Sequence, residues 1–469
     1  MAIGEALASE ASRRLRADWR GQRAALWGAA LLALTIAAVV LYYHATPSVI
    51  LDPDSPAYLR VARTIMAGGG LVDPSRLPGY PLLISLVWLV AGGRTLDALG
   101  VTQAALFVVG IMEVYGVGLV VWRRAWLAFI PAALAGVNVH LISYMHPLLT
   151  EALTLALLGA LALALLWWMA APSAGRLWLV ALVVAATFMT RPEWVFLPIP
   201  LMAALALLAW RRGDRTVLRA TLTHGALAVV ALYALVGAYI FANGQIHGYY
   251  GFSEIQAYNL LGKTLQYHLV GDAPAHYAAT DAAMRSFLAR GQTDPWQAAR
   301  EYAPFRADHL QLMSDYARAM ILRHPVAFAA GCWGTLLHSL TFSEPFHPMP
   351  AAGGAALAAL NALSDAPLRL MWPVLLIAPL WWLLWARGRG DTTQRRRAEA
   401  LSLVALLVAY DLAMTTAGGY IYYSRLHAPF DPLLMLLVVG SALAGLAWGV
   451  GWLRARLRPA SGVEGASYG

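Results

Sequence analysis

The sequence predicts an all-α integral membrane protein, a polytopic bundle of about 10–12 transmembrane helices. The first observation is composition: 60% of the 469 residues are hydrophobic and only 13% are charged, whereas a soluble domain carries about 25% charged residues. The second is that apolar runs of about 17–25 residues, the length that crosses the hydrocarbon core, recur along the whole chain. The third is that arginines cluster at the ends of these runs.

Each apolar run predicts one span. The predicted spans lie near residues 24–43, 98–121, 125–142, 150–170, 177–190, 194–210, 225–242, 370–386, 401–417 and 432–452. The first follows an arginine-rich arm and shows no small-residue cleavage site, so we expect it to remain as an uncleaved span. Pro78–Ala91 is too short to cross comfortably. Val326–Phe342 is long enough, and a second crossing through Ala351–Ala366 would leave the sides of the later segments unchanged.

The arginines predict the orientation of the bundle. Cytoplasmic loops of membrane proteins carry an excess of Lys and Arg. If the N-terminus is inside, more than half of the basic residues lie in inner segments. We therefore expect a multi-pass protein of the bacterial cytoplasmic membrane with cytoplasmic N- and C-termini. Topology also accounts for the net charge of +9 without a nucleic-acid partner, and a single cysteine, Cys332, excludes a disulfide or a cysteine metal site within the chain.

The chain is interpreted as one transmembrane domain, residues 1–458, followed by a disordered tail, residues 459–469. This topology leaves two long outer loops, loop one at residues 45–97 and loop two at residues 243–368. Loop two contains two predicted amphipathic helices, Asp281–Arg290 and Trp296–Leu322. The candidate functional residues all fall on this outer side.

Loop one opens with two aspartates directly after the first span. Asp52 and Asp54 stand two residues apart, and Ser55-Pro56 predicts the start of an amphipathic helix. A carboxylate at that position is either a simple cap, stabilised by the helix dipole, or a general base that deprotonates a hydroxyl nucleophile. The pair is also compatible with a divalent cation, Mg²⁺ or Mn²⁺, although the sequence requires none and we predict no metal site.

Two outer arginines are candidates for binding a phosphate. Arg76 precedes a Leu-Pro-Gly-Tyr80-Pro turn, and Arg425 lies in the last outer loop between Tyr423 and His427. A guanidinium binds phosphate oxygens through a two-pronged fork, and it can stabilise a phosphate leaving group whose charge grows in the transition state. The alternative for Arg76 is an interfacial arginine that reaches water. The alternative for the tyrosines beside Arg425 is an interfacial aromatic belt.

Further polar residues share this side of the membrane. Glu151, which follows His146 in the short loop before the fourth span, is either an active-site acid or an N-terminal helix charge. Arg191 and Glu193 either contact substrate or pair with each other. Lys263, the only lysine of the chain, is a candidate phosphate contact or a consequence of a GC-rich genome. Acids and cations gathered at one interface suit a sugar phosphate held at the lipid boundary.

The order and spacing of these motifs resemble the GT-C superfamily of polyprenyl-phosphate-sugar-dependent glycosyltransferases. The resemblance is to the bacterial relatives of protein O-mannosyltransferases and of the lipid A aminoarabinose transferase. The series comprises Asp54-Ser-Pro-Ala-Tyr58, Arg76-Leu-Pro-Gly-Tyr80-Pro, Thr150-Glu151, Thr190-Arg191-Pro-Glu193 and Tyr423-Ser-Arg425-Leu-His427-Ala-Pro. No single motif is diagnostic, but the ordered series is fairly specific.

The resemblance implies roles for particular residues. Asp54 matches the loop-one acid that such enzymes use as base, Arg76 and Arg425 match contacts to the donor phosphate, and Glu151 matches a second active-site acid. The commonest bacterial form has Asp-Glu in loop one, whereas a serine follows Asp54 here, so Asp52 is the candidate replacement.

The sequence therefore predicts a hexosyl- or pentosyltransferase that moves a sugar from a polyprenyl-phosphate donor to a hydroxyl of a protein, glycan or lipid acceptor. Transfer takes place at the outer membrane face, beside membrane lipids, with inversion. The candidate residues are Asp54, Asp52 and Glu151 for catalysis, Arg76, Arg425, Lys263 and Arg191 for the donor phosphate, and Tyr58, Tyr80, His146, Glu193, Tyr423 and His427 for substrate binding.

Two alternatives stay open. A lipid-diphosphate-dependent glycan polymerase or ligase would centre its arginines and a histidine in loop two, where Arg300, Arg306, His309 and Arg323 lie. A transporter or flippase of lipid-linked or anionic solutes would show two matching halves and broken helices near the midplane, and no internal repeat is evident in the sequence.

Overall fold

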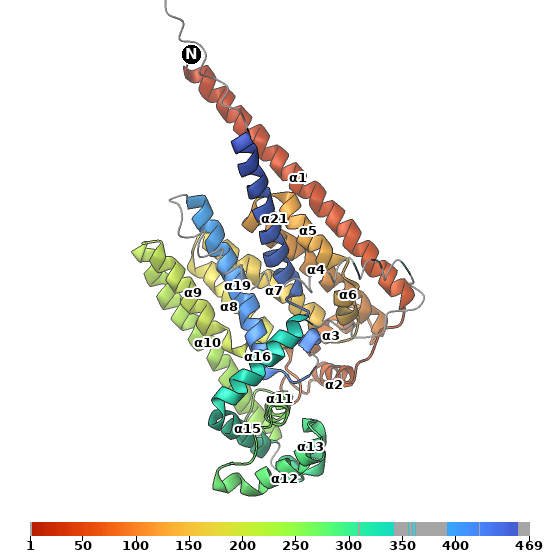
Figure 1. Ribbon diagram of the computed structural model, residues 1–469. Coiled ribbons are helices and arrows are strands. Elements are labelled where there is room, and N and C mark those ends of the chain that lie inside the picture. Colours follow the sequence, from red (N-terminus) through yellow and green to blue (C-terminus); the bar gives the residue numbers. More distant parts are fainter. Residues whose placement is uncertain are drawn as a thin grey trace, which may run out of the picture.

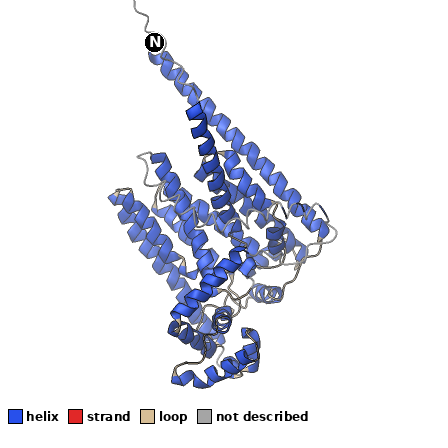
Figure 2. Cartoon of the chain, in the orientation of Figure 1, coloured by secondary structure: helices blue, strands red, loops and turns tan. Residues whose placement is uncertain are grey.

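The computed structural model describes residues 2–307, 310–341, 392–421 and 423–457, and residues 355, 359 and 362 individually. This part of the chain is helical and contains no strand (Figures 1 and 2). Six of its helices are long and apolar enough to cross a membrane, or seven when one bent pair counts as a span. The chain is thus an all-α, multi-pass membrane protein, as predicted.

The six long helices contain six of the predicted spans. They are α1 (Ala2–Ala45), α4 (Leu96–Trp122), α7 (Glu151–Ala170), α10 (Arg215–His247), α19 (Thr392–Gly418) and α21 (Asp431–Leu457). The span predicted near 370–386 lies outside the described residues, as do most of 351–366 and the tail at 459–469. The number of crossings between residues 325 and 386 therefore stays a prediction.

The span predicted over 125–142 is wrong as one straight helix. The chain forms α5 (Ala125–Gly136) and α6 (Val139–Met145), which are bent by 61° relative to each other. Asn138 accounts for the break, because its side chain accepts a hydrogen bond from the amide of Leu141 and so begins a new helix. A single asparagine barely lowers the mean hydropathy of a long apolar run, so the hydropathy pattern did not predict the bend.

Two shorter apolar helices follow α7. They are α8 (Ala174–Thr190) and α9 (Pro198–Arg211), which coincide with the spans predicted at 177–190 and 194–210. A turn of 3₁₀ helix, η1 (Pro192–Phe196), joins them. The α8 helix ends before Pro192 because a proline disfavours the helical conformation of the residue that precedes it.

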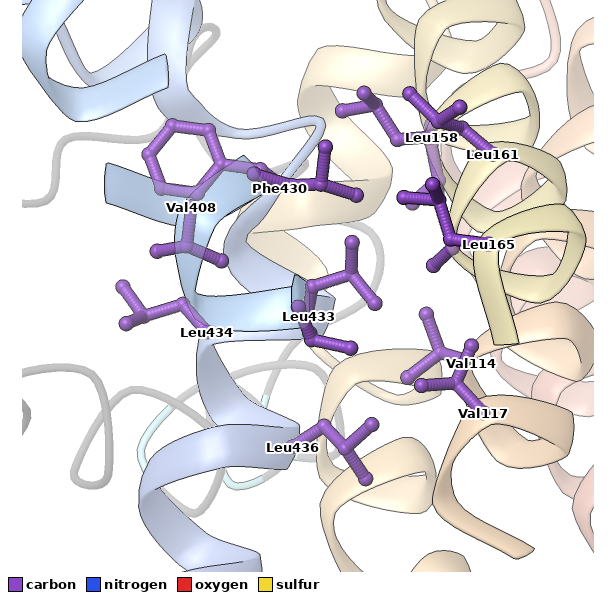
Figure 3. Close-up of a cluster of buried hydrophobic side chains, with 14 of the residues drawn as sticks. Val114, Val117, Leu158, Leu161, Leu165, Val408, Phe430, Leu433, Leu434 and Leu436 are labelled. Atoms are coloured by element: carbon purple, nitrogen blue, oxygen red, sulfur yellow. The ribbon is translucent and has the colours of Figure 1, made fainter. Parts of the chain in front are cut away.

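The membrane-spanning helices share one apolar core. Figure 3 shows part of it, where α4, α7, α19 and α21 face one another through aliphatic side chains and the ring of Phe430. Lipid tails are as apolar as leucine, so this packing is stabilised by close van der Waals contact rather than by removal of apolar surface from water. A rigid framework results, and it presents its loops at defined positions.

The helices of the two long loops lie together at one end of the bundle, the lower end in Figure 1. Loop one forms α2 (Ser55–Met66) and α3 (Gly79–Val90), and loop two forms α11 (Glu254–Gln266), η2 (Ala275–Tyr277), α12 (Ala278–Ala289), α13 (Pro295–Glu301), α14 (Pro304–Ala307), α15 (Gln311–Arg323) and α16 (Pro325–Thr341). The 12 residues of α3 extend about 18 Å, too short to cross the membrane.

Loop two has a small apolar core of its own, built from α11, α12, α13, α14 and α15 around Leu261, Phe287, Phe305 and Tyr316. The amphipathic helix predicted at Asp281–Arg290 is α12, whereas the single helix predicted over Trp296–Leu322 is wrong. That segment divides into α13, α14 and α15. The α13 helix ends at Glu301, where Tyr302 turns to an extended conformation, and Pro304 begins α14, a position that tolerates proline. Leu310 precedes α15 in the left-handed conformation, with φ of 67°.

Candidate active site

Carboxylates and arginines from distant parts of the chain meet at the end of the bundle that carries the two loops. Around Arg425, Nε lies 2.6 Å from Oε1 of Glu151, Nη2 lies 3.1 Å from Oδ2 of Asp54, and Nη1 lies 3.7 Å from Oδ1 of Asp52. The other oxygen of Asp54 accepts a hydrogen bond of 2.6 Å from Nη2 of Arg76. We call these five residues the acid–arginine cluster.

Asp54 occupies the position before α2, but its carboxylate accepts no hydrogen bond from the amides of that helix. The side chain therefore forms no capping hydrogen bond, and both of its oxygens are bound by guanidinium groups. Ser55 stabilises the turn that precedes Asp54 through two hydrogen bonds of its hydroxyl group. The Ser55 hydroxyl accepts a hydrogen bond from the amide of Asp52 at 2.9 Å and donates one to the carbonyl of Leu148 at 2.9 Å.

Glu151 is the first residue of α7. It reaches the cluster because the loop before it is hydrogen-bonded to loop one and to α4. The amide of Leu148 donates to the carbonyl of Ile50 at 3.1 Å. The Gln103 side chain of α4 donates to the carbonyls of Pro147 and Leu149, at 2.7 and 3.1 Å. These contacts satisfy buried polar groups of an irregular segment and bring the chain that carries Glu151 against loop one.

Asp73, which the sequence analysis did not select, organises the turn before Arg76. Its Oδ1 accepts hydrogen bonds from the amides of Ser75 and Arg76, at 2.9 and 3.1 Å, and its Oδ2 pairs with Arg60 at 2.7 Å. Burial alone would raise the pKa of Asp73, but the hydrogen bonds from Arg60 and Ser75 lower it. An aspartate whose side chain accepts a hydrogen bond from the backbone amide two residues later forms an Asx turn. The Asp-Pro-Ser sequence was the signal that could have predicted this turn.

The guanidinium group of Arg76 packs against aromatic side chains. Its guanidinium carbon lies 4.9 Å from the ring centroid of Tyr58, a cation–π contact, and Tyr58 stands edge-on to Tyr80 at 5.1 Å. Both tyrosines are buried, so they support Arg76, and their contact with a substrate stays a prediction. Within the described residues the buried Nε of Arg76 has no hydrogen-bond partner.

Solvent exposure separates the three acids. The side chain of Asp54 is 38% exposed, that of Asp52 9% and that of Glu151 1%. Burial raises the pKa of Asp52, and the hydrogen bond from the Asp54 amide and the charge of Arg425 oppose this. Burial alone would lower the pKa of Arg425, but the charges of Glu151 and Asp54 raise it. Asp52 and Glu151 therefore hold Arg425, and Asp54 is the one of these three acids whose side chain is exposed to solvent.

Arg191 and Glu193 form an ion pair with each other, as the structural alternative proposed. Arg191 lies between α8 and η1, and Glu193 is the second residue of η1. Tyr410 of α19 donates a hydrogen bond of 2.7 Å to the Glu193 carbonyl. Arg191 is buried and also interacts electrostatically with Glu151 and with Asp411, a buried acid of α19. Direct contact of Arg191 or Glu193 with a substrate stays a prediction.

Lys263 lies outside the acid–arginine cluster. Its Nζ donates to the hydroxyls of Tyr267 and Tyr423, at 2.9 and 2.8 Å, and Tyr423 donates to Gln266 at 2.9 Å. Lys263 is 0% exposed and forms no ion pair within the described part of the chain. Burial lowers the pKa of its ammonium group to about 8. It is linked to the cluster through α20 (Tyr423–His427), which also carries Arg425.

The two candidate histidines are buried in different surroundings. Nδ1 of His427 lies 2.9 Å from Oδ1 of Asp431, four residues later. Asp431 was missed, although this spacing places two side chains on one helical face. His146 packs edge-on against Tyr43, with ring centroids 4.4 Å apart. Substrate contact by either histidine stays a prediction.

Two of the loop-two arginines considered for a polymerase or ligase pair with acids of the same loop. Arg323 pairs with Asp272 at 3.1 Å, and Arg300 approaches Asp294 at 3.9 Å. His309 lies outside the described residues. Asp52 and Asp54 are the residues that would hold a divalent cation, and both already contact Arg425.

No model of a known protein family matches the chain, and no curated protein is significantly similar to it. Solved structures of an archaeal oligosaccharyltransferase, AglB of Archaeoglobus fulgidus, are similar to it in fold. The complex with an inhibitory peptide and a dolichol-phosphate shares 15% identity over 93% of this chain and 53% of that chain, with a TM-score of 0.47. The apo form gives the same values.

The complex of the Archaeoglobus protein with Zn and sulfate shares 13% identity over 92% of this chain and 51% of that chain, with a TM-score of 0.43. The chain spans about half the length of the solved chains it resembles.

Proposed function

We propose that the chain is a membrane glycosyltransferase that transfers a sugar from a polyprenyl-phosphate donor to a hydroxyl acceptor, with inversion. The observation that carries the proposal is that the exposed carboxylate of Asp54 lies between the guanidinium groups of Arg76 and Arg425. A base for the acceptor and two cations for the leaving group thus occupy one site at the end of a membrane-spanning bundle.

The donor phosphate is bound by the two arginines. The Nε of Arg76 has no hydrogen-bond partner within the described residues, and Arg425 is held in place by Glu151 and Asp52. A phosphate that accepts hydrogen bonds from both guanidinium groups competes with Asp54 for them. Its arrival therefore releases the Asp54 carboxylate at the moment when the acceptor has to be deprotonated.

The reaction is a single displacement. The acceptor oxygen forms a bond to the anomeric carbon, and its proton passes to Asp54. The bond from that carbon to the phosphate oxygen breaks, and the electron pair leaves on polyprenyl phosphate, whose new charge the arginines stabilise. Attack from the side opposite the phosphate inverts the anomeric centre.

The proposal can be tested with purified protein and polyprenyl-phosphate hexoses or pentoses as donors. The assay measures the polyprenyl phosphate that is released. We expect Asp54→Asn to lower kcat by about 10²–10⁴-fold, the range typical of general-base catalysis. We expect Arg76→Ala to raise KM for the donor. Asp97→Asn changes an exposed acid at the start of α4 and serves as the matched control.

Full turnover by both Asp54→Asn and Arg76→Ala would remove the proposed site. Consumption of a lipid-diphosphate sugar in place of the monophosphate would favour the polymerase or ligase alternative. Movement of an intact lipid-linked sugar across vesicles without cleavage would favour a flippase.

A further inference from the structure

A cavity of about 1240 Å³ opens at the end of the bundle opposite the acid–arginine cluster. It lies among α1, α4, α5 and α19, and its lining includes Arg23, Arg123, Arg124 and Arg397. Arg23 precedes the end of α1 at Ala45 by 22 residues, which corresponds to about 33 Å along the helix. The cavity and the cluster are therefore separated by roughly the thickness of a membrane.

The charge of this cavity has one sign. Within the part of the chain that the structure describes, four guanidinium groups line it and no aspartate or glutamate does. Cations brought together at a low-dielectric wall focus the field and raise the local concentration of anions. Guanidinium is also the side chain best suited to phosphate oxygens, which it binds through paired N–H groups. The lining thus favours a phosphate-bearing anion.

The turn between α4 and α5 that supplies two of these arginines is strained. Arg123 has φ of 54°, the left-handed conformation, which an L-residue other than glycine or asparagine seldom adopts. It ends α4, and Arg124 then begins α5. Strain of this kind is retained where the surrounding structure requires it, commonly at a ligand-binding turn. Here it places two neighbouring arginines in the lining of one cavity.

The remaining lining indicates an amphiphilic occupant rather than a soluble ion. Trp27 and Trp126 belong to it, together with Leu119, and tryptophan is enriched where hydrocarbon meets lipid headgroups. Leu26, beside Trp27, is 70% exposed on the outer surface of α1, where acyl chains would lie. The volume also exceeds the roughly 300–1,000 Å³ of an ordinary small-molecule pocket.

We propose that this cavity binds the headgroup of an anionic phospholipid, with its phosphate on the arginines and its acyl chains along α1. Basic pockets between transmembrane helices are known to bind acidic lipid headgroups. The lipid bridges α1 to the α4–α5 turn and α19, so it stabilises the fold. The proposal does not depend on the glycosyltransferase activity.

The test measures thermal unfolding of the full chain in neutral detergent with added phosphatidylglycerol, cardiolipin, phosphatidylcholine or inorganic phosphate. We expect the acidic lipids to raise the unfolding temperature and the other two to leave it unchanged. We expect the double variant Arg123→Gln, Arg124→Gln to weaken the acidic-lipid response at least tenfold in midpoint concentration. The control Arg215→Gln, Arg219→Gln removes two exposed charges at the start of α10 that do not line the cavity.

An unchanged response in the Arg123, Arg124 variant, or an equal loss in the control, would overturn the proposal. An equal effect of inorganic phosphate would show a site for a free anion and would also overturn it. Because the variant could fail to fold, the wild-type chain supplies a second measurement. A phosphatidylglycerol with a photoreactive group should label residues 119–127 or Trp27, and labelling confined to other helices contradicts the proposal.

Discussion

Arg425 is the residue on which the acid–arginine cluster depends. Its guanidinium contacts carboxylates from loop one and from α7, and a planar group with five N–H donors can serve several oxygens at once. A buried ion pair adds little net stability, but the loss of one partner leaves an uncompensated charge. The acid–arginine cluster is therefore sensitive to the loss of Arg425.

We predict that Arg425→Met lowers the free energy of unfolding by about 3–5 kcal/mol, because Glu151 is left buried without its cation. The double variant Arg425→Met, Glu151→Gln should regain part of that stability without regaining transfer. Thermal unfolding and sugar transfer measured on the same preparations separate the two effects. A double variant no more stable than the single one would show that Glu151 does not depend on Arg425.

At the scale of elements, α3 and α8 meet closely beside the site. A Cβ atom on Gly79, the first residue of α3, would stand 2.5 Å from Oγ1 of Thr190 and 2.7 Å from the carbonyl oxygen of Met189. The Pro-Gly turn after Arg76 thus lets α3 begin directly against the end of α8. This contact places Arg76 relative to Arg191.

We predict that Gly79→Ala destabilises the fold and lowers transfer, because backbone atoms of α8 have to move. The control is Gly237→Ala in α10, where a Cβ meets no atom within 4 Å. Alanine in a helix interior is better than glycine by roughly 0.5–1 kcal/mol, so the control should be equal or slightly more stable. Unfolding temperatures of both variants give the comparison, and an equally stable Gly79→Ala would contradict the close approach.

The short helix α20 links two elements, since Arg425 belongs to the acid–arginine cluster and Tyr423 binds Lys263 of α11. Burial lowers the pKa of Lys263 from 10.5 to about 8. Between these two values the unfolded chain holds a proton that the folded chain has released. Stability should therefore rise with pH from about 8 to about 10.5, and it should be insensitive to this group at lower pH.

The only lysine of the chain makes this measurable. Selective ¹⁵N-lysine labelling should give one side-chain resonance that titrates near pH 8, and Lys263→Met should abolish the rise in unfolding temperature between pH 8 and 10. A titration midpoint near 10.5 would mean that the ammonium group is solvated or paired.

At the scale of the whole molecule, chemistry is divided between the two ends of the bundle. The helices of loops one and two lie at one end (Figure 1). The acid–arginine cluster lies at this end, and the arginine-lined cavity lies at the other. Long apolar helices separate the ends.

We predict that the two ends face opposite sides of the membrane. In a Cys332→Ser background, Ser286→Cys in α12 should react with a membrane-impermeant maleimide added to intact cells. Arg219→Cys in α10 should react only after the membrane is opened. Both residues are exposed, and labelling of both from the same side would contradict the proposed orientation.

Much of this architecture could be predicted from residues that are close together in the sequence. Spans such as 24–43 and 432–452 follow from hydropathy alone, because a membrane helix satisfies its backbone hydrogen bonds within itself. Arginine placement then predicted that Asp54, Arg76, Glu151 and Arg425 share one side. The break at Asn138 was missed because one capping side chain is a weak signal within an apolar run.

By itself, the sequence determined the helical class, the long apolar spans and the residue types available at the outer loops, because each depends on neighbours along the chain. Only the tertiary structure decided that Asp54 binds two arginines while Glu151 is buried, that Asp73 shapes the Arg76 turn, and that Lys263 binds tyrosines. These roles depend on partners far away in sequence, and packing of the bundle determines which of them come within bonding distance.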